Sequence, residues 1–197
     1  MEIRKEFNIS RFRIGNEDRY EFKNGLELEQ FMFGYHSDPE KFVRVPKNQR
    51  LPYWYLFRTA VIESIRLGRD YPGMVELAQP CFAPILFREV KASLHRREAQ
   101  HLQMYAVVGS RLDYDYGVDC IFILDNAVVT LDATLNPFVK RQTLPHEFVF
   151  SPYDLSGART TAFAKEIAES LRNPESYRHI LRQIKHDIYD AIYRYRR

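Results

Sequence analysis

The sequence predicts an α/β (α+β) domain with a central mixed sheet flanked by helices. Two apolar, β-rich runs between residues 118 and 135 flank Asp125-Asn126, a pair suited to a two-residue hairpin turn. Apolar residues elsewhere recur at the spacing of amphipathic helices. Of the 197 residues, 45% are hydrophobic and 28% are charged, a balance typical of one globular domain. We therefore expect a single domain over 1–197, with an N-terminal addition (1–50), a core (51–155) and a C-terminal segment (156–197).

The N-terminal addition is predicted to combine short strands with one helix. Charged residues interrupt the apolar ones up to Phe22, which favours short strands. Apolar side chains then recur at helical spacing over 25–35, and Asn24 suits the N-cap of that helix. Pro39, Pro46 and Pro52 indicate loops around one further short strand, Phe42 to Val45.

Two longer helical segments are predicted in the core. Trp54, Phe57, Val61 and Ile65 recur at helical spacing over 53–67, and Gly68 ends the pattern. A second pattern predicts a long helix, or two helices, over 85–108. Its apolar positions are Leu86, Val90, Leu94, Leu102 and Tyr105.

Glu98 falls between Leu94 and Leu102 in this stripe, so we expect its carboxylate on the inward face of the helix. Asp113–Gly117 is interpreted as the turn that leads into the hairpin.

The hairpin register is predicted to bring two aspartates together. With the turn at Asp125-Asn126, residue n pairs with residue 251 − n, which places Asp119 opposite Asp132, with Thr134 next on the same face. Neighbouring carboxylates in an apolar hairpin repel each other, and Mg²⁺ or Mn²⁺ would compensate them. The alternatives are an exposed aspartate at a strand end, or a register slip that separates the pair.

These residues resemble the motif of the PD-(D/E)xK phosphodiesterase superfamily, whose core is restriction-endonuclease-like. The match consists of Glu98, then Asp119, then Asp132-Ala133-Thr134, within about a quarter of the chain. The resemblance implies that Asp119 and Asp132 hold the metal together with the Ala133 carbonyl. It implies that Glu98 completes the site, with Glu89 as its rival.

The sequence departs from that family in two places. Thr134 stands where the family has a lysine, whose positive charge orients the attacking water and stabilises the transition state. Lys140 could fold back to supply that charge. The family also places a crossover helix before its fourth strand, whereas Pro137 and Pro145 leave little room for a helix before the apolar run Glu147–Phe150.

The net charge of +3 is concentrated at the C-terminus. From Ser156 onward there are nine basic and five acidic residues, so this segment carries +4 and the remainder −1. Two helices are predicted there, over 160–171 and 174–195. The basic side chains that lie off the apolar stripe of the last helix could contact nucleic-acid phosphates, or simply form a solvated face; they include Arg178, Arg182, Lys185 and Arg196.

The sequence thus predicts a metal-dependent nuclease that acts on DNA, within a phage, mobile-element or defence system. The first alternative is a catalytically degenerate nucleic-acid-binding or assembly subunit, which the threonine at position 134 favours. The second is a protein–protein interaction module that uses the aromatic residues Tyr53-Trp54-Tyr55. Two cysteines among apolar neighbours, and no apolar leader, favour a cytoplasmic protein without a membrane segment.

Overall fold

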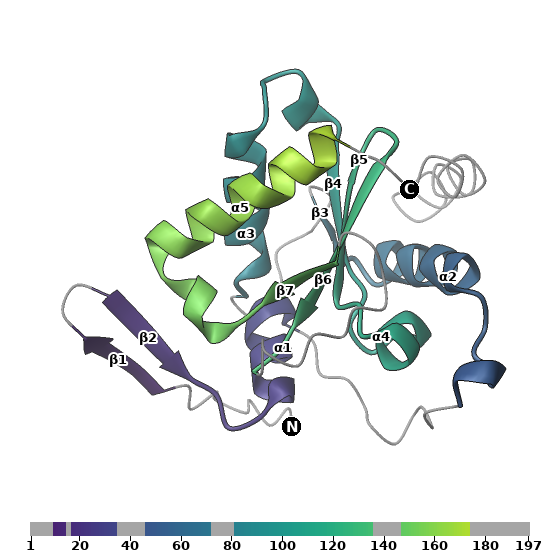
Figure 1. Cartoon of the computed structure of the whole chain (residues 1–197), viewed down its shortest axis with the longest axis horizontal. Helices are drawn as coiled ribbons and strands as arrows, with labels where there is room; N and C mark the ends of the chain where they lie inside the picture. The colour runs from purple at the N-terminus through teal and green to yellow at the C-terminus, as the bar shows by residue number, and fades with distance from the viewer. Residues whose placement is uncertain (1–9, 15–16, 35–45, 72–80, 136–146, 174–197) are drawn as a thin grey trace.

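A five-stranded mixed sheet forms the centre of the computed structural model, which describes residues 10–14, 17–34, 46–71, 81–135 and 147–173 (Figure 1). Neighbouring strands in the order β3-β4-β5-β6 are antiparallel, and β7 lies parallel to β6. The predicted class, a mixed sheet flanked by helices, is confirmed. The strands are β3 (Asp70–Tyr71), β4 (Leu102–Ala106), β5 (Cys120–Leu124), β6 (Ala127–Ala133) and β7 (Glu147–Phe150).

Helices cover both faces of this sheet, which gives three layers (Figure 1). One face is covered by α3 (Ala83–Ser93) and α5 (Gly157–Arg172), which pack against each other. The other face is covered by α2 (Tyr53–Arg66) and α4 (Arg111–Tyr116). Short 3₁₀ turns join these elements: η1 (Lys47–Gln49), η2 (Glu98–Gln100) and η3 (Pro152–Leu155).

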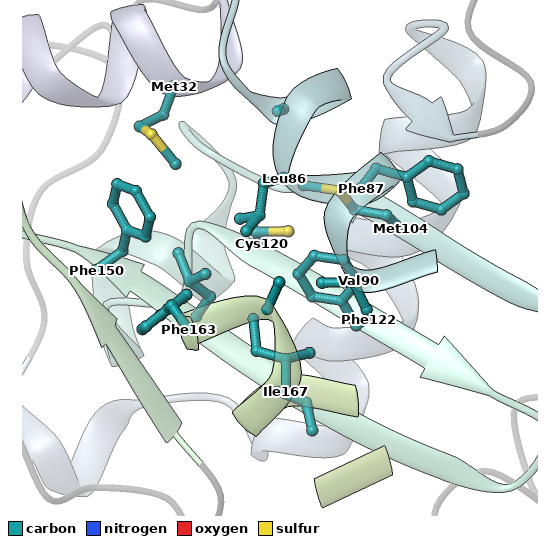
Figure 2. Close-up of a cluster of buried hydrophobic side chains, with 14 of the residues drawn as sticks. Met32, Leu86, Phe87, Val90, Met104, Cys120, Phe122, Phe150, Phe163 and Ile167 are labelled. Atoms are coloured by element: carbon teal, nitrogen blue, oxygen red, sulfur yellow. The ribbon is translucent and has the colours of Figure 1, made fainter. Parts of the chain in front are cut away.

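Each face of the sheet has its own apolar core. Met104, Phe122 and Val129 pack toward α3 and α5, where Leu86 is fully buried (Figure 2). The alternate residues of the same strands face α2 and α4, among them Tyr105, Ile121, Ile123 and Val128. Because side chains alternate along a strand, an apolar run without polar interruptions is what a strand buried on both faces requires.

The N-terminal addition contains a separate two-stranded sheet and one helix. β1 (Ser10–Ile14) and β2 (Glu17–Glu21) pair with each other, outside the main sheet (Figure 1). The helix predicted over 25–35 is confirmed as α1 (Gly25–Phe33), and the Asn24 side chain accepts a hydrogen bond from the Glu27 N–H, as an N-cap should. The strand predicted over Phe42–Val45 lies outside the described residues.

The prediction of one long helix, or two helices, over 85–108 is wrong for the second half of that range. The helix ends at Ser93, and residues 102–106 form the central strand β4. Leu102 and Met104 are buried on one face of β4, and Tyr105 is buried on the other. A short apolar run is compatible with the periodicity of a helix or of a strand. In this fold the run is buried on both faces of the sheet, as a central strand requires.

The predicted hairpin register is confirmed from the turn as far as Cys120. Leu124 pairs with Ala127, Ile121 with Thr130 and Cys120 with Leu131, each pair obeying the 251 − n rule. Asp125 adopts φ 52°, the left-handed conformation that an aspartate in such a turn tolerates.

The strand β7 lies at the edge of the sheet, beside β6. It pairs in parallel with β6, with Asp132 opposite Val149. Residues 136–146, which make this connection, lie outside the described residues. Because Pro137 and Pro145 leave little room for a crossover helix, a parallel neighbour after so short a link was not expected, yet β7 pairs in parallel with β6.

The packing of α3 on the sheet predicts the effect of two neighbouring substitutions. Leu86→Ala should lower the free energy of unfolding by about 2–5 kcal/mol, because Leu86 is fully buried and its removal leaves a cavity. Ile85→Ala, one residue earlier on the same helix and 41% exposed, should change it by less than about 0.5 kcal/mol. Urea denaturation monitored by circular dichroism measures both, and equal effects would contradict the observed packing.

Candidate functional site

The Asp119 carboxylate lies where β5 and β6 separate. Its Oδ2 accepts a hydrogen bond from the Ala133 backbone N–H at 2.6 Å. The Asp119 N–H donates to the Leu131 carbonyl of β6, whereas its own carbonyl accepts the Val107 N–H from the other side. Leu131 is already paired with Cys120, so Asp119 and Cys120 on one strand both face Leu131 on the other, as in a β-bulge. The side chain of Asp119 thereby accepts the hydrogen bond from Ala133 that the backbone of β5 would accept in a regular ladder.

This geometry corrects the expectation that Asp119 and Asp132 form a regular cross-strand pair. The regular pairing ends one residue earlier, at Cys120 and Leu131. The two carboxylates nevertheless interact, since the charge of Asp132 raises the pKa of Asp119. The sequence predicted that the two groups are neighbours, and the bulge changed how they approach each other.

Burial and neighbouring negative charges hold the pKa of Asp119 well above its ordinary value. Burial is the largest cause, followed by the charges of Asp113, Glu29 and Asp132; the hydrogen bond from Ala133 acts in the opposite direction. The side chain is almost completely removed from water, with only 2% of the residue exposed. We call Glu29, Asp113, Asp119 and Asp132 the carboxylate cluster.

Two members of the carboxylate cluster come from parts of the chain that the sequence analysis did not assign to the site. Asp113 belongs to α4, whose N-cap Ser110 accepts the Asp113 N–H, while the Asp113 carboxylate accepts the Gly109 N–H at 2.7 Å. Glu29 belongs to α1, which packs against β6. The predicted turn over Asp113–Gly117 is in fact this short helix, α4. Neither residue carries a local signal, because only the tertiary packing of the helices brings them to Asp119.

Asp132 and Thr134 occupy the end of β6. Asp132 is buried, with 9% of the residue exposed, and Thr130, two residues earlier on the same strand face, is buried as well. Within the described residues the Thr130 hydroxyl has no hydrogen-bond partner. Thr134 is half-buried, and its N–H donates to the Phe150 carbonyl of β7. The end of β6 is therefore hydrogen-bonded on one side to Asp119, through the Ala133 N–H, and on the other side to β7, through the Thr134 N–H.

The placement predicted for Glu98 is wrong. It lies in the turn η2, directly before the end of β4 that pairs with Leu124 beside the hairpin turn. Asp119 is at the opposite end of the hairpin. The Glu98 carboxylate accepts the His95 N–H at 3.0 Å and binds Arg172 at 3.2 Å, and these contacts hold its pKa below the ordinary value. Glu98 therefore joins α5 to η2 and is no part of the carboxylate cluster.

The remaining predicted site residues divide into two groups. The rival Glu89 accepts a hydrogen bond from the Thr161 hydroxyl of α5, on the α3 and α5 side of the sheet. Lys140 lies outside the described residues, and so do the basic residues predicted to contact nucleic acid: Arg178, Arg182, Lys185 and Arg196.

A nearby aspartate shows how a buried carboxylate is compensated within the chain. Asp115, also on α4 and 2% exposed, pairs with Arg111 at 2.8 Å. The charges that act most strongly on Asp119 are all acidic. Asp119 is therefore the buried carboxylate for which a bound cation would bring the larger electrostatic gain.

The donor set of the carboxylate cluster suits a hard divalent cation. Among the described residues, no three acidic, histidine or cysteine side chains are grouped so that they could hold a metal ion by themselves. Mg²⁺ requires less from the protein, because it is usually bound by one or two carboxylates and keeps water or phosphate oxygens as its other ligands. The carboxylates of Asp119 and Asp132 fit that requirement.

The comparisons with known proteins identify no relative. No protein-family model, curated protein or solved structure matches this chain. The resemblance to the PD-(D/E)xK superfamily thus rests on the motif residues themselves. In the described part of the chain, no helix is both long enough and apolar enough to cross a membrane.

The raised pKa of Asp119 predicts that Asp119→Asn stabilises the protein at neutral and alkaline pH. An unfolded aspartate titrates near 3.8, whereas the folded protein holds this proton to higher pH, so wild-type stability falls as pH rises from about 3.8 through the folded pKa. Asparagine keeps an oxygen for the Ala133 N–H and has no charge to lose. The melting temperature of Asp119→Asn should exceed that of the wild type at pH 8, by about 2–4 °C for each kcal/mol gained, and the difference should shrink toward pH 4.

Asp119→Ala is the matched control for that comparison. It removes the charge together with the hydrogen bond, which leaves the Ala133 N–H buried without its partner at a cost of about 1–3 kcal/mol. Melting curves of the two variants at several pH values separate the two contributions. An Asp119→Asn protein that melts below the wild type at pH 8 would contradict the electrostatic description.

Proposed function

We propose that the protein is a divalent-cation-dependent phosphodiesterase that cleaves DNA, with its site at the carboxylate cluster. The observation that carries this proposal is the buried Asp119 carboxylate, which lies among acidic neighbours without a basic residue among its strongest charge interactions. Mg²⁺ or Mn²⁺ would neutralise the cluster and would bring the positive charge that phosphate binding requires. The motif Asp119 and Asp132-Ala133-Thr134, with its resemblance to the PD-(D/E)xK superfamily, supports the same chemistry.

Each residue at the ends of β5 and β6 has a role in this proposal. Asp119 and Asp132 would hold the cation, and the nearby charges of Glu29 and Asp113 would add to the negative field that favours it. A bound cation lowers the pKa of water and polarises the scissile phosphate. The Thr134 hydroxyl would orient the attacking water by hydrogen bonding, and Lys140 would supply the positive charge that the family lysine provides.

The threonine at position 134 favours a second candidate function. A threonine cannot supply the charge of the family lysine, so the same fold would serve as a nucleic-acid-binding or assembly subunit that does not cleave. The two functions differ in one observable property. The enzyme cleaves DNA only with a divalent cation, whereas the binder retains DNA in a salt-sensitive manner and leaves it intact.

Loss of the Asp132 carboxylate should abolish cleavage. We expect the wild type to cleave single-stranded, duplex or branched DNA with Mg²⁺ or Mn²⁺, and Asp132→Asn to be slower by at least about 10- to 100-fold, the loss typical of even outer-shell partners of a metal. Glu98→Gln is the matched control, since it neutralises a carboxylate at the opposite end of the hairpin. Gel assays of strand cleavage measure the rates. Cleavage that survives Asp132→Asn would overturn the catalytic assignment.

Lys140→Ala separates the charge supplied in catalysis from cation binding. Because lysine does not bind a cation, the thermal stabilisation by Mn²⁺ should be unchanged, while the cleavage rate should fall by about 100-fold or more. Thermal shift and cleavage are measured on the same preparation. An unchanged rate would exclude Lys140 from the reaction.

A further inference from the structure

An exposed aromatic surface, flanked by the half-buried Arg50 and Arg58, lies at the start of α2. Leu51, Trp54 and Tyr55 are 48%, 45% and 41% exposed. They make up half of the six large apolar side chains that are exposed in the described part of the chain. Arg58 lies three residues after Tyr55 and four after Trp54, on the same helix face, and Arg50 precedes them. We call Arg50, Leu51, Trp54, Tyr55 and Arg58 the α2 surface.

Contacts with α4 hold the α2 surface in place. The Tyr116 hydroxyl donates to the Leu51 carbonyl at 3.1 Å, and the Arg50 guanidinium lies over the Tyr116 ring at 5.7 Å. Tyr53 meets the same ring edge-on, with centroids 5.3 Å apart. Trp54 and Tyr55 meet edge to face at 6.1 Å. The backbone that carries the two exposed rings is thus held against α4, and the rings pack on each other, which limits the conformational entropy lost when a ligand stacks on them.

The charge of the segment is complementary to a polyanion. Between Pro46 and Ile62 there are three basic residues, Lys47, Arg50 and Arg58, and no acidic residue. Exposed aromatic rings that stack on bases, beside arginines that contact phosphates, are the recurring means of binding single-stranded nucleic acid. A duplex would not offer its bases in this way, because they are already stacked on one another.

We propose that the α2 surface binds single-stranded DNA, with bases stacked on Trp54 and Tyr55 and phosphates held by Arg50 and Arg58. The inference deepens the proposed nuclease function and rests on it for the choice of DNA. One helix connects the two regions: α4 carries Tyr116, which fixes the α2 surface, and Asp113, whose charge acts on Asp119. A strand bound at the α2 surface thus lies on the α2 and α4 side of the sheet.

Trp54 makes binding directly observable, because it is the only tryptophan of the chain. In EDTA, so that no cleavage can occur, a 20-residue oligodeoxythymidine should quench its fluorescence saturably, and a duplex of the same length should quench it less. By fluorescence anisotropy of labelled oligonucleotide, Trp54→Ala should weaken binding about 5- to 150-fold, the range for loss of one stacked base. Trp54→Phe should restore most of the affinity.

Matched variants separate this surface from other exposed groups. Tyr153→Ala removes an aromatic side chain in η3 that is 63% exposed, and it should leave the affinity unchanged. Arg58→Gln should lower the slope of log affinity against log salt by about 0.7, the value for one phosphate contact on a single strand. Circular dichroism establishes that each variant is folded.

Two results would overturn the proposal. One is the absence of saturable quenching at low salt, and the other is an affinity that Trp54→Ala leaves unchanged. If DNA does not bind and Trp54→Ala instead abolishes self-association in sedimentation, the surface is a protein interface. The binding assay contains no metal, so it is independent of cleavage. Binding to DNA without cleavage in a later assay with metal would refute the nuclease and keep this inference. Cleavage that Trp54→Ala leaves unchanged would refute this inference and keep the nuclease.

Discussion

The hydrogen bond from the Ala133 N–H to the Asp119 carboxylate is the contact on which the candidate site depends. It takes the place of a backbone hydrogen bond at the point where β5 turns away from β6, so a side-chain carboxyl group stands where a regular ladder has a carbonyl. Helices cover both faces of the hairpin and exclude water from that point (Figure 1). The same packing that makes the hairpin stable thereby raises the pKa of Asp119.

The carboxylate cluster brings acidic side chains near one another around the buried Asp119. Two other carboxylates are compensated within the chain: the buried Asp115 by Arg111, and the partly exposed Glu98 by Arg172. At Asp119 the neighbouring charges have the same sign, which costs stability without giving a structural benefit. Local conflicts of this kind concentrate at functional sites, where a ligand resolves them. The proposed ligand is a divalent cation, because hard divalent cations prefer oxygen donors.

The sequence predicted what local rules decide. The Asp125-Asn126 turn and the two apolar runs fixed the hairpin register, and Asn24 marked the start of α1. It failed at β4, since a short apolar run is compatible with helix or strand until its neighbours are known. Because residues 85–108 were expected to be helical, Glu98 was wrongly assigned to the site. Glu29 and Asp113 were missed because they reach Asp119 only through the packing of α1 and α4, and the bulge at Asp119 has no signal in side-chain alternation.

The central claim is that the carboxylate cluster binds a divalent cation in exchange for the proton of Asp119. Titration calorimetry with Mn²⁺ in buffers of different ionisation enthalpy measures both events at once, because released protons are taken up by the buffer. The account predicts saturable binding with proton release at a pH below the raised pKa of Asp119, and loss of that release in Asp119→Asn. Absence of binding, or binding whose heat is the same in every buffer, would contradict it.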